Sequence, residues 1–321
     1  MSGDLMFLYS DGFKRYYTLD YFYKNKFKCK IAKVSLNAGF TCPNMDGTLS
    51  NKGCIYCSKS GSGEFAGDKN LSIEEQFYSV KKIMDRKWPN SKYIAYFQAR
   101  TNTYAPLDKL KKVYESVLEL DNVVGISIAT RPDSISLECL DYLEELSKRT
   151  FLTVELGLQT INNDTSILIN RCHTLECFDN MVYELKNRGI NVLVHIINGL
   201  PYETSNMMLD TVRHLNKLPI DGIKFHMLCV LKNTPLEKYY EINKFHILSK
   251  EEYIDIVCNQ LEILRPDIVV NRITSDTSID LLIEPMWIVK KRCIINDIDK
   301  ELRRRNTYQG IYYNEKNSSC Y

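Results

Sequence analysis

Short apolar runs recur along the chain and alternate with longer segments whose apolar residues repeat at helical spacing. The runs have the length of strands and cover residues 33–37, 92–99, 123–130, 151–160, 191–200 and 221–231. One helical pattern begins after Ser72, and another ends at Gly189, a residue type that suits the left-handed end of a helix. Strands and helices are therefore expected to alternate up to about residue 235.

This alternation predicts an α/β fold with parallel strands. Right-handed crossovers would give either an open sheet or a partial barrel, with the functional site at the carboxyl ends of the strands. We expect three regions: a basic, aromatic arm over residues 1–30, a core over 31–235, and a helical extension packed on that core over 236–321.

Polar residues at every second position of the predicted strands form a further pattern. Both faces of a parallel strand are usually apolar, so such a row indicates a lumen that holds water or a ligand. The candidates are Gln98, Ser127, Glu155, Gln159, His195, Lys224 and His226. Each could be a hydrogen-bonded structural residue when taken alone. Because they come from five strands, a ligand-filled barrel is favoured over a dry core.

Composition changes this picture little, whereas charge adds a hypothesis. The 321 residues are 44% hydrophobic and 26% charged, as in an ordinary globular protein. The net charge of +2 hides two basic ends, with seven Lys and Arg against one acid over residues 14–33 and seven against three over 286–305. A polyanion would be expected to meet these ends first.

The N-terminus lacks the pattern of a secretory signal, and no apolar run approaches the roughly 18 residues of a membrane span. We therefore expect a cytoplasmic protein with no membrane partner. In such a reducing compartment, the 11 cysteines are more often core residues, nucleophiles or metal ligands than disulfides. Six of them lie singly in patterned segments and are expected to be small core residues: Cys139, Cys172, Cys177, Cys229, Cys258 and Cys293.

Cys42, Cys54 and Cys57 differ, because they lie together in a turn-rich segment directly after the first predicted strand. Successive turns can bring three sulfurs to one centre. A structural zinc site normally has four protein ligands, whereas an iron–sulfur cluster with three protein ligands keeps one iron open to an exogenous group. Cys29, with 12 residues between it and Cys42, leaves a four-cysteine zinc knot as an alternative, although it precedes the first strand.

The cysteine loop, with Tyr56 directly before the last thiol, resembles the cluster loop of radical S-adenosylmethionine enzymes. It is most similar to the longer-gapped form of the YhcC/YtqA family, relatives of the elongator catalytic subunit. Further blocks resemble that family over residues 31–310: "YFQARTNTYAP" (96–106), "ATRPDSI" (129–135), "VELGLQT" (154–160), "INRCH" (169–173), "HIINGLP" (195–201) and "DLLIEPMW" through "ELRRR" (280–305). One departure is Cys172, at a position where the family is expected to favour glycine.

The resemblance implies a six-stranded partial TIM-like (βα) barrel with a 4Fe-4S cluster at its mouth and a basic C-terminal extension. It implies an enzyme that cleaves S-adenosylmethionine (SAM) reductively, with a reductant such as flavodoxin or ferredoxin. The resemblance carries over the cluster ligands and the two main SAM contacts, and the other candidates follow from their places in the predicted lumen and turns. Cys42, Cys54 and Cys57 would ligate the cluster; Gln159 and Arg171 would hold SAM, with Gln98, Glu155 and Asn198 as further contacts to its amino group, ribose or adenine; His195, Lys224 and His226 would meet the substrate.

The resemblance also implies a tRNA substrate, because the nearest relatives of the family modify wobble uridine. YtqA-type members are linked to trimming a carboxymethylaminomethyl side chain towards aminomethyl. The basic ends suit RNA: aromatic residues such as Tyr16 and Tyr23 interleave with lysines near the N-terminus, and the arginines 303–305 lie largely off an apolar helix row. Two alternatives stay open, a radical enzyme acting on a small metabolite and a non-catalytic, zinc-bound RNA-binding protein.

Overall fold

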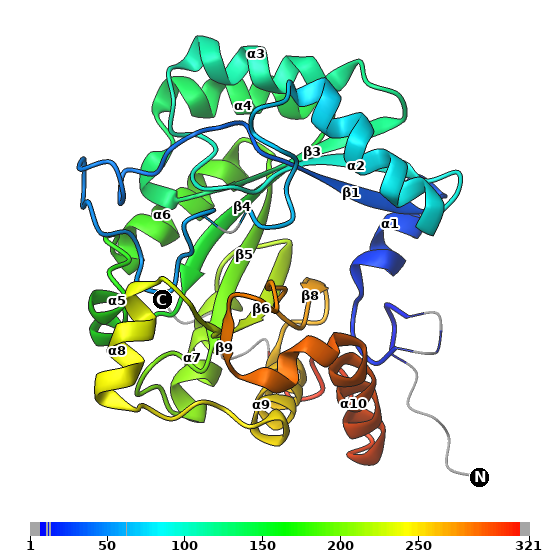
Figure 1. Cartoon of the computed structure of the whole chain (residues 1–321). Coiled ribbons are helices and arrows are strands. Elements are labelled where there is room, and N and C mark those ends of the chain that lie inside the picture. Colours follow the sequence, from blue (N-terminus) through cyan, green and yellow to red (C-terminus); the bar gives the residue numbers. More distant parts are fainter. Residues whose placement is uncertain (1–6, 11, 13, 62, 315–321) are drawn as a thin grey trace. The chain divides into compact units, whose positions relative to one another are not determined.

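Seven strands form one sheet in the computed structural model, which describes residues 7–10, 12, 14–61 and 63–314 (Figure 1). Their order is β1-β2-β3-β4-β5-β6-β8, and the fold is a curled, partial barrel of parallel strands. The strands are β1 (Ile31–Leu36), β2 (Lys92–Phe97), β3 (Val123–Thr130), β4 (Phe151–Gln159), β5 (Asn191–Asn198), β6 (Gly222–Met227) and β8 (Val269–Arg272). The six strands predicted from the apolar runs are thus confirmed.

Ten α-helices occupy the connections in the described residues. They are α1 (Leu19–Phe27), α2 (Ile73–Lys87), α3 (Leu107–Leu118), α4 (Leu137–Arg149), α5 (Asn163–Leu168), α6 (Leu175–Asn187), α7 (Ser205–Leu215), α8 (Pro235–Asn243), α9 (Lys250–Ile263) and α10 (Lys291–Arg304). The expected start of α2 is confirmed by a capping box between Ser72 and Glu75. Gly189, just beyond α6, has the positive φ of 72° that the sequence indicated.

The chain divides into two compact units. The β1–β4 unit comprises residues 23–157 and 170–193, and the β5–β8 unit comprises residues 158–169, 194–314 and the described residues up to Phe22. The last two residues of β4, Leu158 and Gln159, belong to the second unit. The three regions expected from the sequence (1–30, 31–235 and 236–321) do not follow the boundaries of these two units. That division of the chain stays a prediction.

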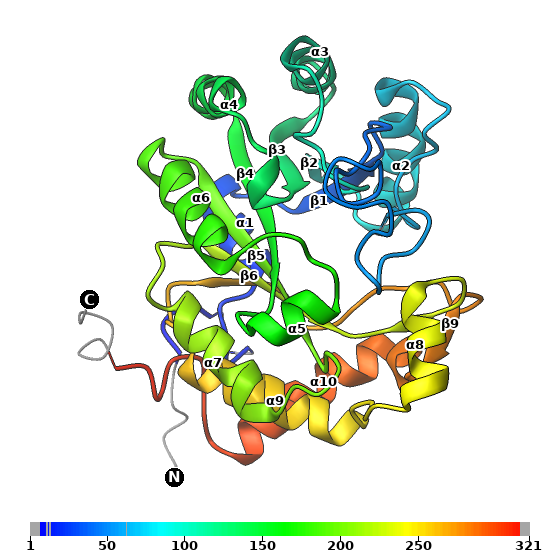
Figure 2. The same ribbon diagram turned by 90° about the vertical axis from the view of Figure 1, so that its left-hand side faces the viewer.

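In the β1–β4 unit, α2, α3, α4 and α6 lie along one face of the strands (Figure 2). The strands pair in parallel, with Val34 opposite Ala95 and Ala95 opposite Ile126. These residues are almost fully buried, as expected for strands covered on both faces. The loops at the carboxyl ends of these strands, including the long segment between β1 and α2, therefore extend from a buried apolar base.

In the β5–β8 unit, α9 packs between α7 and α10 (Figure 1). Of the apolar row predicted for α10, Ile294, Ile298 and Leu302 are 0% exposed, whereas Ile295 is half-buried. The predicted strand over 221–231 is divided into β6 and the short β7 (Val230–Leu231), and β7 pairs antiparallel with β9 (Leu282–Glu284). Both β8 and β9 lie in the region 236–321 that was expected to be helical. The apolar run of β8 is too short to register as a strand in the sequence pattern.

Part of the predicted N-terminal arm packs on the β5–β8 unit. Thr18 forms a parallel bridge with Val270, and Tyr16 is only 5% exposed. Lys14 forms an ion pair with Asp299 of α10. No helix among the described residues is long and apolar enough to cross a membrane.

Candidate active site

The cysteine loop follows β1 and is built from tight turns around each thiol. The amides of Met45 and Asp46 both donate to the carbonyl of Cys42, and the Cys57 amide donates to the Cys54 carbonyl at 3.0 Å. Gly61 is required by close packing, because a Cβ atom there would lie 2.5 Å from Cγ of Arg100. The turns and this close approach fix the path of the loop against the end of β2.

Two asparagines clasp this loop to the segment that carries Arg171. Asn44 is fully buried, and its Nδ2 donates to the carbonyl of Asn170 at 2.6 Å. In return, Asn170 Nδ2 donates to the carbonyl of Gly53 at 2.7 Å. Asn44 Nδ2 also lies 3.4 Å from Sγ of Cys54, within reach of an N–H···S bond. Sequence reasoning gave no role to Asn44, because a single asparagine in a turn carries no periodic signal.

The three thiols are half-buried and lie close enough to influence one another. The pKa of Cys57 is raised to about 12, first by burial and then by the thiolates of Cys54 and Cys42. Burial also raises the pKa of Cys54, while Arg131 lowers it. Thiolates in such surroundings are stabilised by a cationic centre. The arrangement therefore supplies three soft ligands whose charge a metal centre would neutralise.

Arg171 and Arg131 bring positive charge to the same loop. Arg171 is 3% exposed, and its Nε and Nη2 donate to the carbonyl of His173 at 3.1 and 2.9 Å. Burial lowers its pKa, and Tyr56 and Cys54 act in the opposite direction, so these groups lie near the guanidinium. Arg131 is held by two hydrogen bonds to Asp133, at 2.9 and 2.6 Å.

The backbone conformation at Cys172 accounts for the glycine that is expected at this position. Its φ is 63°, in the left-handed region that favours glycine, and its side chain is exposed. The prediction of a core residue is therefore wrong for Cys172, and also for Cys293, which is exposed on α10. It is confirmed for Cys139 and Cys258, which are buried, whereas the remaining two single cysteines, at positions 177 and 229, are half-buried.

Glu155 and Gln98 are the weaker SAM candidates of the β1–β4 unit. Glu155 is 1% exposed, and its Oε1 accepts from Lys33 Nζ at 2.8 Å and from Ser127 Oγ at 2.5 Å. This network favours a structural role for Glu155. Gln98 is half-buried immediately after β2. A cavity of about 700 Å³ also opens at the carboxyl ends of β1 to β3, lined in part by Thr41 and Asp133.

The predicted substrate residues lie together in the β5–β8 unit. The rings of His195 on β5 and His226 on β6 are 5.0 Å apart, and both side chains are half-buried. Lys224 lies two residues before His226 on β6 and is 4% exposed. At a spacing of two, Lys224 and His226 share one face of the strand.

Gln159 and Asn198 differ in how their amides are used. Gln159 has a φ of 69°, and its buried Oε1 finds no hydrogen-bond partner in the part of the chain that the structure describes. Asn198 is 1% exposed, and its amide exchanges two hydrogen bonds of 2.8 Å with Gln260 of α9. This pairing favours a structural role for Asn198 over an adenine contact, whereas Gln159 keeps an acceptor available for a ligand.

The position of Cys29 argues against a zinc knot. It precedes β1, whereas the cysteine loop follows β1, and the six residues of this strand span about 20 Å. Cys29 therefore does not complete a four-ligand site with the cysteine loop.

Comparison with known proteins identifies the family. The model of the radical SAM superfamily matches residues 48–215, and that of the radical SAM C-terminal domain matches residues 220–304. YtqA of Bacillus subtilis is 50% identical over 307 residues, which cover 96% of this chain and 95% of that protein. YhcC of Escherichia coli is 31% identical over 274 residues, covering 85% and 87% respectively.

A solved structure supports the fold. The archaeal Elp3 of Methanocaldococcus infernus superposes with a TM-score of 0.64 over 88% of this chain and 64% of that one, at 16% identity.

The donor set fits the cofactors of this family, a 4Fe-4S cluster and SAM. Three mutually interacting thiols are the ligands that such a cluster needs, and the N–H of Asn44 near Cys54 Sγ suits a thiolate. With the family matched over more than half of the chain, a non-catalytic zinc protein is no longer supported. The chain therefore belongs to the radical SAM superfamily, as a YhcC/YtqA-type iron–sulfur enzyme that cleaves SAM and is related to elongator protein 3.

Proposed function

We propose that this enzyme modifies the side chain of the wobble uridine in tRNA, trimming carboxymethylaminomethyl towards aminomethyl. The observation that carries the proposal is the relationship to the elongator proteins. Elongator complex protein 3 of Schizosaccharomyces pombe is 25% identical over 163 residues, which cover 50% of this chain and 29% of that protein. The family resemblance links such relatives to wobble uridine, and a base in the anticodon loop is unpaired and accessible to an active site.

In this proposal Cys42, Cys54 and Cys57 ligate the cluster and leave one iron for SAM. When bound, the reduced cluster supplies the electron that splits SAM into methionine and a 5′-deoxyadenosyl radical. The chain itself provides charge and order around the thiolates. Arg131 lowers the pKa of Cys54, and Arg100 lowers that of Cys57 against the larger effect of burial. A flavodoxin or ferredoxin would supply the electron.

Arg171 and Gln159 are the proposed SAM contacts. The buried guanidinium of Arg171 lies near the cysteine loop, where it can attract the carboxylate of SAM. The unpartnered Oε1 of Gln159 can accept a hydrogen bond from an amino or hydroxyl group. His195, His226 and Lys224 are proposed to meet the substrate, since the first two place their rings 5.0 Å apart beside the buried cation of Lys224.

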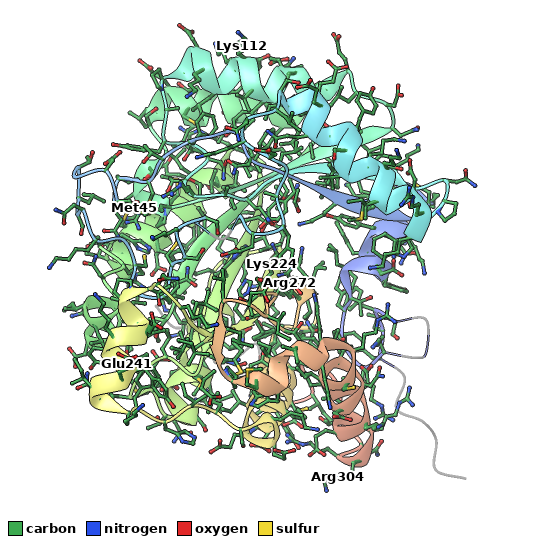
Figure 3. All side chains as sticks on the ribbon, viewed as in Figure 1. Met45, Lys112, Lys224, Glu241, Arg272 and Arg304 are labelled. Carbon is green, nitrogen blue, oxygen red and sulfur yellow. The ribbon has the colours of Figure 1, made fainter. Side chains whose placement is uncertain are left out.

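Fewer residues are available to bind RNA than the sequence indicates. Arg305 is only 16% exposed in its side chain and binds Asp255 and Glu301, so it is committed within the unit. Tyr16 and Tyr23 are 5% and 7% exposed and are unavailable for stacking on bases. Exposed cations of the C-terminal region carry the proposal instead. They are Lys290, Arg292, Arg303 and Arg304, the last of which is labelled at the outer end of α10 in Figure 3.

Nucleoside mass spectrometry of tRNA tests the proposal. A strain that lacks the gene should accumulate carboxymethylaminomethyl-uridine and lose aminomethyl-uridine, and the wild-type gene should restore the profile. A gene encoding Cys57→Ala should fail to restore it, whereas Cys29→Ala should succeed. An unchanged nucleoside profile in the deletion strain would contradict the proposal and favour a small-metabolite substrate.

A further inference from the structure

Four charged side chains gather at β6, β8 and α10 within the β5–β8 unit. Lys224 and Arg272 are register partners on the parallel strands β6 and β8, and Figure 3 labels them beside each other. Nη1 of Arg272 lies 3.1 Å from Oδ2 of Asp276. Lys291, at the start of α10, forms an ion pair with the other carboxylate oxygen of Asp276. One carboxylate thus organises cations from three separate elements.

The carboxylate of Asp276 is ionised and lies among cations from three elements. Burial acts to raise the pKa of Asp276, but Arg272, Lys291 and Lys224 outweigh it, so the net shift of the pKa is downward and the carboxylate stays ionised. Arg272, Lys291 and Lys224 thus all lie close enough to Asp276 to act on the same carboxylate. Lys224 is 4% exposed, which strengthens its attraction for an oxyanion by keeping water away.

The group is nevertheless open to a ligand. The side chains of Arg272, Asp276 and Lys291 are 32%, 31% and 39% exposed. Within the described residues, Arg272 contacts Asp276 through Nη1, and a guanidinium carries five N–H donors in a planar fork. Such a fork matches the two oxygens of a carboxylate or a phosphate.

Unpartnered hydroxyl groups in the segment after β8 also favour an anion site. Within the described residues, the hydroxyls of Thr274 and Thr277 are buried and lack hydrogen-bond partners. Hydroxyl groups can donate to an anion, and native proteins rarely leave them unsatisfied. The segment is held in place by Ser275, whose Oγ accepts from the Met227 amide at 2.7 Å.

We propose that Arg272, Lys291 and Lys224 form a subsite that binds an oxyanion of the substrate, with Asp276 holding the cations in position. The inference rests on the proposed function, since a tRNA with a carboxymethylaminomethyl wobble uridine offers a side-chain carboxylate and neighbouring phosphates. The subsite adjoins His226, which shares a strand face with Lys224. The anion would thus be held next to the pair of histidines proposed to meet the substrate.

Binding of inorganic phosphate tests the subsite without RNA. The full chain is melted with and without phosphate at constant ionic strength. Phosphate should raise the melting temperature of the wild type, because a ligand that binds the folded state stabilises it. The rise should disappear in Arg272→Gln and in Lys291→Gln. It should persist in the control Arg213→Gln, which alters an exposed Arg–Asp pair on α7. An equal rise in all four proteins would overturn the proposal.

Three tRNAs then identify the source of the oxyanion. They carry carboxymethylaminomethyl-uridine, aminomethyl-uridine or plain uridine at the wobble position. If the subsite binds the side-chain carboxylate, Arg272→Gln should weaken binding of the first tRNA alone, by about tenfold. If it binds a phosphate, all three affinities should fall by the same factor, with a weaker salt dependence.

Two results would overturn the assignment to the substrate. One is unchanged affinity of Arg272→Gln for all three tRNAs, and the other is a loss of SAM affinity with tRNA binding intact. Failure of the proposed function gives a different result. In that case the wild type would convert none of the tRNAs, while the phosphate measurement would still decide whether the subsite exists.

Discussion

Cys172 occupies a backbone conformation that suits glycine, next to the buried Arg171. A non-glycine residue in the left-handed region costs about 1 kcal/mol, and a β-branched residue costs more. Cys172→Gly should therefore raise the free energy of unfolding by up to about 1 kcal/mol, and Cys172→Val should lower it by about 1–2 kcal/mol. Urea denaturation measures both. Cys293→Val on the exposed face of α10 is the control and should change stability by less than about 0.5 kcal/mol.

Glu203 gives the protein a pH-dependent stability. Burial raises its pKa from the ordinary 4.5 to about 7, against hydrogen bonds from Thr160 and Thr165 that lower it. Between these pH values the folded protein holds a proton that the unfolded chain has released. The free energy of unfolding should therefore fall as the pH rises from about 4.5 to about 7 and then level off. Urea titrations at several pH values should show a flatter profile for Glu203→Gln, and identical profiles would contradict the assignment.

At the scale of elements, Arg305 joins α10 to α9. Its guanidinium binds Asp255 Oδ1 at 2.6 Å and Glu301 Oε1 at 2.7 Å, and its side chain is 16% exposed. Removing it leaves acidic groups without their counter-charge, so Arg305→Ala should lower the free energy of unfolding by about 2–3 kcal/mol. Arg304→Ala is a matched control, because Arg304 binds the same Glu301 but is 74% exposed. Its effect in the same thermal or urea unfolding experiment should stay below about 1 kcal/mol.

The cysteine loop should bind its cluster through Cys42, Cys54 and Cys57, without Cys29 as a ligand. Anaerobic reconstitution is expected to give about four irons per chain, as in a cubane cluster. Cys57→Ala should lose the iron and the cleavage of SAM, whereas Cys29→Ala should retain both, because Cys29 lies at the opposite end of β1. Iron and sulfide analysis with SAM cleavage assays checks these outcomes. Stoichiometric zinc without iron uptake would contradict the assignment of the ligands.

The sequence predicts helices and strands better than it predicts which side chains contact one another. Six strands follow from long apolar runs, but β8 has only a short one, and without β8 the cluster of Arg272 and Asp276 could not be foreseen. Likewise, the polarity of Asn198 indicated a ligand contact, because periodicity cannot show that Gln260, 62 positions later, pairs with its amide. Residue types and spacing locate a side chain on an element, whereas its partner depends on packing between distant segments.

At the scale of the whole molecule, charge decides how the enzyme meets RNA. Replacing Lys290, Arg292 and Arg303 with glutamine should weaken tRNA binding. It should also lower the number of counterions released on binding by about two, because each phosphate contact that is lost no longer displaces its counterion. SAM cleavage without RNA should be unchanged. Filter binding across salt concentrations measures the effect. The control neutralises the exposed Lys82, Arg86 and Lys87 of α2, and equal losses in both triple variants would point to non-specific attraction instead.

The asparagine clasp between Asn44 and Asn170 bears on what happens to the chain when its cluster is lost. Because the clasp joins the cysteine loop to the Arg171 segment through protein atoms alone, the loop can keep its form after a cluster is lost. A chain without its cluster should therefore keep the cysteine loop in place, ready to bind a new cluster.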